Sequence, residues 1–113
     1  MAVAQFIQQG ISIDYTPGAD VSAGDIVVQG DLLGVAQIDI AANQLGAVAV
    51  AGVFDIDKAT GAGTGIAVGT KVYWDAANKQ ATASDGGGAN KYLGKTIAAA
   101  GETGVKVRVR LEQ

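Results

Sequence analysis

Hydrophobic and polar residues alternate along short segments of this chain, and turn-forming residues separate the segments. The clearest case is Lys71–Asp75, where Val72 and Trp74 fall on one face of a strand and polar residues on the other. Residues 75–78 read Asp-Ala-Ala-Asn, which indicates a type I turn that the Asp carboxylate closes and in which Asn takes the left-handed conformation. Gln80–Thr82 then returns as the second strand of a hairpin. Trp74, the single tryptophan, is the expected anchor of the core.

The rest of the chain follows the same pattern of short apolar segments and turns. Ile11–Tyr15 alternates, whereas Gly46–Phe54 is apolar on both faces, which is typical of a buried strand; its valines favour strand over the helix that its alanines would allow. Residues 56–60 are the one segment expected to hold a helical turn. The other predicted strands comprise residues 6–7, 26–28, 32–40, 66–68, 92–98 and 105–111.

These elements predict an all-β fold, because strands of this length recur with turn signals every ~8–12 residues. We expect one small domain spanning residues 1–113, a β-barrel or sandwich with Gly-rich loops, for which a β-tulip-like arrangement is one form. Residues 1–10 fit either an N-terminal arm or an ordinary first strand. With 17 Gly and many Ala, the core is thin, and an oligomeric or docked state would support it.

Two pairs of segments resemble each other within the chain. Asp39–Gln44 parallels Asp75–Gln80. Leu33-Gly34, followed by Gly46 and alternating valines, parallels Leu93-Gly94, followed by Gly104 and alternating valines. We interpret the likeness as one turn chemistry used twice, and both copies favour hairpins over helices.

The side chains present argue against catalysis and against a bound cofactor. The chain has no His and no Cys, so the commonest general base and the most nucleophilic side chain are both absent. Gly61–Lys71 has the composition of a phosphate loop, but its order is Gly-Thr-Lys and a strand follows, whereas a phosphate loop opens a helix. Asp55 and Asp57 could offer oxygens to a cation, but the dense acidic spacing of a calcium loop is missing, so no metal is expected.

Charge and hydropathy exclude two classes of partner. A net charge of −3 argues against a general nucleic-acid binder, which needs a dominant basic patch. No apolar run approaches the ~18 residues of a membrane span, and the start of the chain lacks the features of a signal peptide.

The last predicted strand is the most informative charged element. Its apolar face comprises Val105, Val107, Val109 and Leu111. Its other face carries a row formed by Lys106, Arg108 and Arg110, three of the eight basic residues in the chain. This row is a solvated outer face, an edge strand charged to block edge-to-edge aggregation, or an interface that pairs with carboxylates of another protein.

Several segments, taken in their order along the chain, resemble those of a known family. They are Gln5–Gly10, Ser22–Val28, Gly52–Phe54, Val72–Asp75, Leu93-Gly94 and Val105–Leu111. The chain resembles small phage and prophage proteins described as capsid cement or head-decoration proteins, once a domain of unknown function and sometimes labelled as RecA/RadA-like recombinases. The failed phosphate-loop pattern counts against the recombinase label.

The resemblance implies a non-enzymatic virion protein that is made in the bacterial cytoplasm, joins the capsid surface and stabilises the head. It implies the major capsid protein as partner and a homotrimer as the oligomeric state. From strand position, we expect the interface to include Phe6, Ile7, Lys106, Arg108 and Arg110. Two alternatives remain, namely a minor neck or tail component and a glycan- or protein-binding barrel that uses Tyr73, Tyr92 or Trp74.

Overall fold

The computed structural model describes residue 3 and residues 11–111, and these residues form strands and one short 3₁₀ helix. The all-β prediction is confirmed. The elements are β1 (Ser12–Tyr15), β2 (Ile26–Gln29), β3 (Leu32–Ala36), β4 (Gly46–Ala49), β5 (Gly52–Asp57), β6 (Lys71–Asp75), β7 (Gln80–Thr82), η1 (Gly86–Gly88), β8 (Lys91–Thr96) and β9 (Lys106–Leu111).

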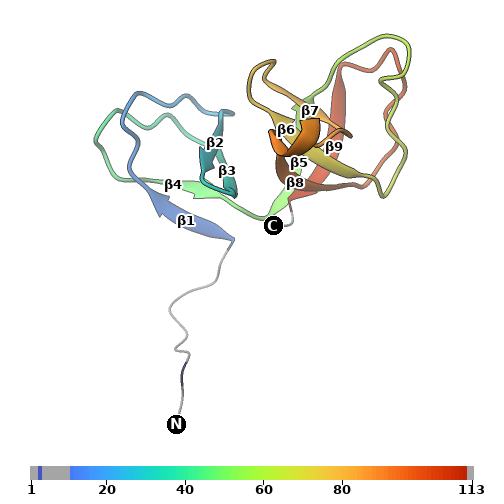
Figure 1. The fold of residues 1–113 in the computed structure, drawn as a ribbon. Coiled ribbons are helices and arrows are strands. Elements are labelled where there is room, and N and C mark those ends of the chain that lie inside the picture. The colour runs from blue at the N-terminus through green and yellow to red at the C-terminus, as the bar shows by residue number, and fades with distance from the viewer. Residues whose placement is uncertain (1–2, 4–10, 112–113) are drawn as a thin grey trace.

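The strands form two antiparallel sheets that lie side by side (Figure 1). The first sheet has the order β1-β4-β3-β2, and the second has the order β5-β9-β8-β6-β7. A single parallel bridge between Lys58 and Ala81 brings the two edges of the second sheet together. Within residues 11–111 no continuous ladder follows that bridge, so the second sheet curls without closing into a barrel.

The two sheets repeat one arrangement of strands. In the first unit (residues 11–50) β1, β2, β3 and β4 pair in the order 1-4-3-2, and in the second unit (residues 52–111) β5, β6, β8 and β9 pair in the corresponding order 5-9-8-6. Each unit also has an isolated antiparallel bridge just outside its strands, Val21–Ile40 in the first and Ile66–Ala100 in the second. The second unit therefore corresponds to the first with β7 and η1 inserted.

The internal sequence likeness has two structural origins. Leu33 and Leu93 lie in the corresponding strands β3 and β8, both are fully buried, and a buried glycine follows each. The likeness of Asp39–Gln44 to Asp75–Gln80 does not follow the repeated strands, but both turns take a positive φ at their fifth residue, 64° and 53°. The interpretation as reused turn chemistry therefore holds for the two turns. It does not cover the Leu-Gly pairs, which resemble each other because they lie in corresponding strands.

Three strand predictions were wrong in extent. The segment predicted as one strand over Gly46–Phe54 ends at Ala49 and restarts at Gly52, whose φ of +123° turns the chain from the first sheet into the second. The segment over 32–40 stops at Ala36, and the one over 66–68 forms only the bridge at Ile66. The helical turn over 56–60 is also wrong, because β5 continues to Asp57 and Lys58 bridges to β7.

Two hydrophobic clusters support the sheets. The main cluster lies between them and includes Leu33 and Val35 from the first sheet with Val72, Leu93 and Val109 from the second. A smaller cluster of Val27, Ala36, Ile40 and Val48 packs within the first unit. Trp74 is half-buried and packs against the edge of the main cluster, so its role as anchor of the core stays a prediction.

Candidate functional site

The outer face of β9 carries the cations that the sequence singled out. Burial alternates along Lys106–Leu111, with the three basic side chains exposed and Val107, Val109 and Leu111 buried. Val105 lies outside the strand and is 65% exposed, so it does not extend the apolar face as expected. β9 is an interior strand of the sheet, between β5 and β8, and therefore its charges do not protect a sheet edge.

Two of these cations pair with carboxylates on the neighbouring strand β5. Arg108 stands opposite Asp55 and donates from Nε to Oδ1 at 2.9 Å and from Nη2 to Oδ2 at 3.2 Å. Lys106 stands opposite Asp57, and its Nζ donates to Oδ1. The hydrogen bond from Arg108 lowers the pKa of Asp55, and Asp55 in turn raises the pKa of Arg108.

This pairing limits what the carboxylates of β5 and the cations of β9 can bind. Asp55 and Asp57, the candidate cation ligands, are engaged by Arg108 and Lys106, and residues 11–111 hold no group of three or more potential metal ligands. Exposed pairs such as these contribute little to stability, but they partly neutralise the β9 row. The prediction that Lys106 and Arg108 contact a partner stays a prediction, and such a contact would have to compete with β5.

Arg110 belongs to a second row of cations that runs across the strands. It stands opposite Lys95 on β8, and Lys95 stands opposite Lys71 on β6, so these three side chains form what we call the basic row. All three are exposed. At the far end of the row, Arg110 faces Val53, which is 51% exposed. Like charges directly opposite each other oppose strand pairing, so the row is a feature that the fold tolerates.

Sequence reasoning missed the basic row because its members are far apart in the chain. Lys71 and Lys95 sit 24 positions apart, and only the β6–β8 register brings them opposite each other. The sequence indicated that Lys71 and Lys95 lie on exposed positions of the strands predicted at 71–75 and 92–98. It did not indicate that these two strands pair with each other.

Two tyrosines lie beside the basic row. Tyr73 on β6 stands opposite Tyr92 on β8, with ring centroids 5.8 Å apart in an edge-to-face arrangement. A register shift between Val72 and Tyr73 marks a β-bulge, which leaves Leu93 as the extra residue on β8. Both tyrosines are half-buried.

The hairpin turn after β6 forms as predicted except at one residue. The Asp75 carboxylate accepts the backbone N–H groups of Ala77 at 3.1 Å and Asn78 at 3.2 Å, and the Asn78 side chain donates to it at 2.8 Å. These hydrogen bonds lower the pKa of Asp75, with the Asn78 side chain as the largest cause. The left-handed residue is Lys79 and not Asn78, because the four-residue loop places that conformation at its last position.

A buried lysine and the Gly-rich loop line the same cavity. Lys58 is 5% exposed, and its Nζ donates to the carbonyl oxygens of Ala59 at 2.6 Å and Gly104 at 2.9 Å. A cavity of about 330 Å³ adjoins it, with Thr64 and Gln80 in the lining. The N–H of Gly63 donates to the carboxylate of Glu102, so this loop amide is held by a carboxylate of the chain itself. That arrangement differs from a loop whose amides converge on phosphate.

The remaining candidates do not converge on one site. Phe6 and Ile7 lie outside the described residues. Trp74 borders a cleft of about 500 Å³ between the sheets, together with Tyr15 and Ile26. Tyr92 is not among the residues that line this cleft. Glycan binding through Tyr73, Tyr92 or Trp74 therefore stays a prediction.

Comparisons with known proteins identify a family. A family model described as phage cement protein matches residues 7–111. No curated protein and no solved structure matches the chain. Among the described residues, no helix is long and apolar enough to cross a membrane.

Proposed function

The chain belongs to the phage cement protein family, and on this premise we propose that it binds the outside of a phage head shell and stabilises it without catalysing a reaction. The family implies a structural role in stabilising the capsid. The observation that carries the proposal is the extent of the match, which runs from residue 7 to residue 111.

The proposed partner is the major capsid protein, and the proposed form on the shell is a homotrimer. The protein is made in the bacterial cytoplasm and becomes part of the virion surface. Contacts repeated over a symmetric lattice bind with high avidity even when each one is weak. A small β fold with an exposed, charged sheet face suits this role, because it can bridge neighbouring shell subunits without enclosing a ligand.

Particles that lack this protein should release their DNA at a lower temperature than complete particles, and adding the purified protein from outside should restore the difference. Contacts that bridge neighbouring shell subunits oppose the pressure of the packaged DNA on the shell. The recovery of heat resistance should therefore level off at a fixed ratio of added protein to shell subunits. The measurement is DNA release against temperature, using a dye that cannot enter intact heads.

An unrelated small acidic protein, added at the same concentration, serves as the control and should change nothing. If the deficient particles are as heat-resistant as complete ones, or if filled heads take up no protein from outside, the proposed function is wrong.

A further inference from the structure

The repeated arrangement of the two units extends to single hydrogen bonds. In the first unit the N–H of Gly24 donates to the carbonyl of Ala36 at 2.6 Å, and in the second unit the N–H of Gly69 donates to the carbonyl of Thr96 at 2.9 Å. Both glycines have a positive φ, 92° and 78°. Because the units correspond this closely, the segments in which the second unit differs from the first can be identified.

Two insertions distinguish the second unit. Between the end of β5 and the bridge at Ile66 lie residues 58–65, whereas the corresponding segment between β1 and Val21 comprises only residues 16–20. The other insertion contains β7 and η1. The parallel bridge of Lys58 with Ala81 joins the first insertion to the second.

The cavity of about 330 Å³ beside Lys58 lies where the two insertions meet. Its lining comes from residues 58–59 and 63–66 and from residues 80–84. Apart from Ile66, all of these residues belong to the insertions. The cavity is therefore built by what the second unit adds to the shared arrangement.

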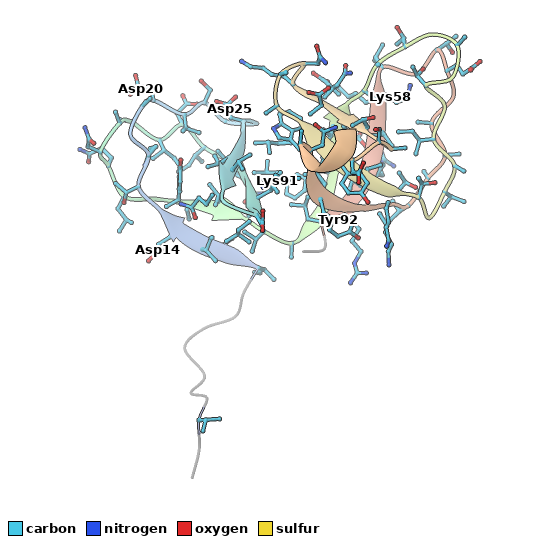
Figure 2. The ribbon with its side chains drawn as sticks, in the orientation of Figure 1. Asp14, Asp20, Asp25, Lys58, Lys91 and Tyr92 are labelled. Carbon is cyan, nitrogen blue, oxygen red and sulfur yellow. The ribbon has the colours of Figure 1, made fainter. Side chains whose placement is uncertain are left out.

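Lys58 gives this cavity a buried positive charge. Its ammonium group has three N–H donors, and two of them bond to the carbonyl oxygens of Ala59 and Gly104, so one donor is left. Among residues 11–111 no carboxylate forms an ion pair with Lys58. Figure 2 shows Lys58 in the second unit, well apart from the labelled aspartates of the first. Within the described residues the buried charge thus has neutral partners only, and a carboxylate is the group that would complete them.

The rest of the lining contains further hydrogen-bond donors. The hydroxyl oxygens of Thr82 and Ser84 accept the N–H groups of Ser84 at 3.2 Å and of Gly86 at 3.1 Å, and each hydroxyl keeps its own O–H to donate. Gln80 is half-buried, and its side-chain amide makes no hydrogen bond within the described residues. These groups suit the oxygens of an anion.

We propose that this cavity binds one carboxylate group, with the Lys58 ammonium as its counter-ion and with Gln80 and Ser84 as further donors. The carboxylate of Glu102 holds the N–H of Gly63 in the same loop and repels a second negative charge, so the site selects a monoanion over a phosphate dianion. Two sources supply such a group, a small organic acid and an acidic side chain of a shell subunit. The second source rests on the proposed function, whereas the site itself does not.

Titration of the full chain with propionate, which has the structure of a Glu side chain, tests the site. In ¹⁵N–¹H spectra, saturable shifts should appear at the backbone N–H groups of the cavity lining, with a dissociation constant of about 1 mM. Propionamide, a neutral molecule of the same shape, is the matched ligand control and should cause no such shifts.

Substitutions identify the groups that bind. Lys58→Met should weaken propionate binding by at least about tenfold, because the counter-ion is lost. Lys79→Met makes the same change at an exposed turn outside the cavity and should bind like the wild type. Gln80→Met removes a donor without breaking a hydrogen bond of the described residues and should weaken binding by about three- to tenfold. Its control is Gln29→Met at an exposed position of β2.

The spectrum of each variant also verifies that its fold is retained. The absence of saturable shifts, equal shifts with propionamide, or shifts confined to surface lysines would overturn the proposal. Unchanged binding by Lys58→Met would do the same. If Lys58→Met does not fold, unchanged binding by Gln80→Met decides against the proposal instead.

Particles that lack the protein identify the source of the carboxylate. If an acidic side chain of the shell fills the cavity, propionate should reduce the uptake of this protein by the particles more than chloride does at the same ionic strength. Lys58→Met should then be taken up more weakly than Lys79→Met. Uptake that propionate leaves unchanged assigns the site to a small acid. Because the titration contains no shell, its failure and the failure of the proposed function are separate results.

Discussion

Replacing Leu33 by Ala should lower the free energy of unfolding by about 2–5 kcal/mol, the range found when a buried leucine is truncated in a packed core. Leu33 is fully buried in β3, where it belongs to the main cluster between the two sheets. The change leaves a cavity at the junction of the two units. Because small domains are stable by only about 5–15 kcal/mol, the loss should be visible at once in a urea titration.

Leu32→Ala is the matched control for this prediction. It is the same substitution one position earlier, at a side chain that is 38% exposed, and should cost much less. Equal losses for the two variants would mean that the first sheet does not pack on the second through Leu33.

Gly34→Ala should cost about 1–3 kcal/mol, because a methyl group does not fit there. A Cβ at Gly34 would lie 2.5 Å from Cγ2 and 2.9 Å from Cβ of Val48, on the strand next to it. The measurement is again the free energy of unfolding by urea. Gly18→Ala is the control, since a Cβ at Gly18 meets nothing within 4 Å, and it should change stability by less than about 0.5 kcal/mol.

A double-mutant cycle tests whether the clash with Val48 causes the loss of stability in Gly34→Ala. When Val48 is first changed to Ala, the added cost of Gly34→Ala should shrink but not vanish, because Cγ2, the nearest clashing atom, is gone while Cβ remains at 2.9 Å. An unchanged cost in that background would contradict the steric explanation.

Local features of this fold could be predicted from the sequence. The alternation of Lys71–Asp75 and of Lys106–Leu111 shows which side chains face the core, because a strand has a period of two. The turn after Asp75 was predictable for a similar reason, since the carboxylate bonds to the backbone only two and three residues further on.

Features that depend on strand pairing could not be predicted in this way. Arg108 finds Asp55 across 53 positions of sequence, and alternation alone does not say which strand is the neighbour. Lys58 was expected in a helical turn, yet it is buried because its ammonium group reaches the carbonyl of Gly104, 46 positions away. The repeated strand arrangement was not predicted, because the sequence likeness is confined to the Leu-Gly pairs and to Gly46 and Gly104 with the alternating valines that follow them.

The family resemblance, in contrast, depended on the order of weak motifs over the whole chain, and the family match over residues 7–111 confirms it. It bears on the role of the protein more directly than any pocket or residue cluster of the described structure does. The contacts with the shell, including those expected of Phe6 and Ile7, remain predictions.

Quantitative mass spectrometry of purified particles, from the phage or the induced prophage that encodes this chain, tests the central claim most directly. A cement protein that covers the shell should be present at a copy number close to that of the major capsid protein. A few copies per particle would instead indicate a neck or tail component, and absence from the particle would contradict the account.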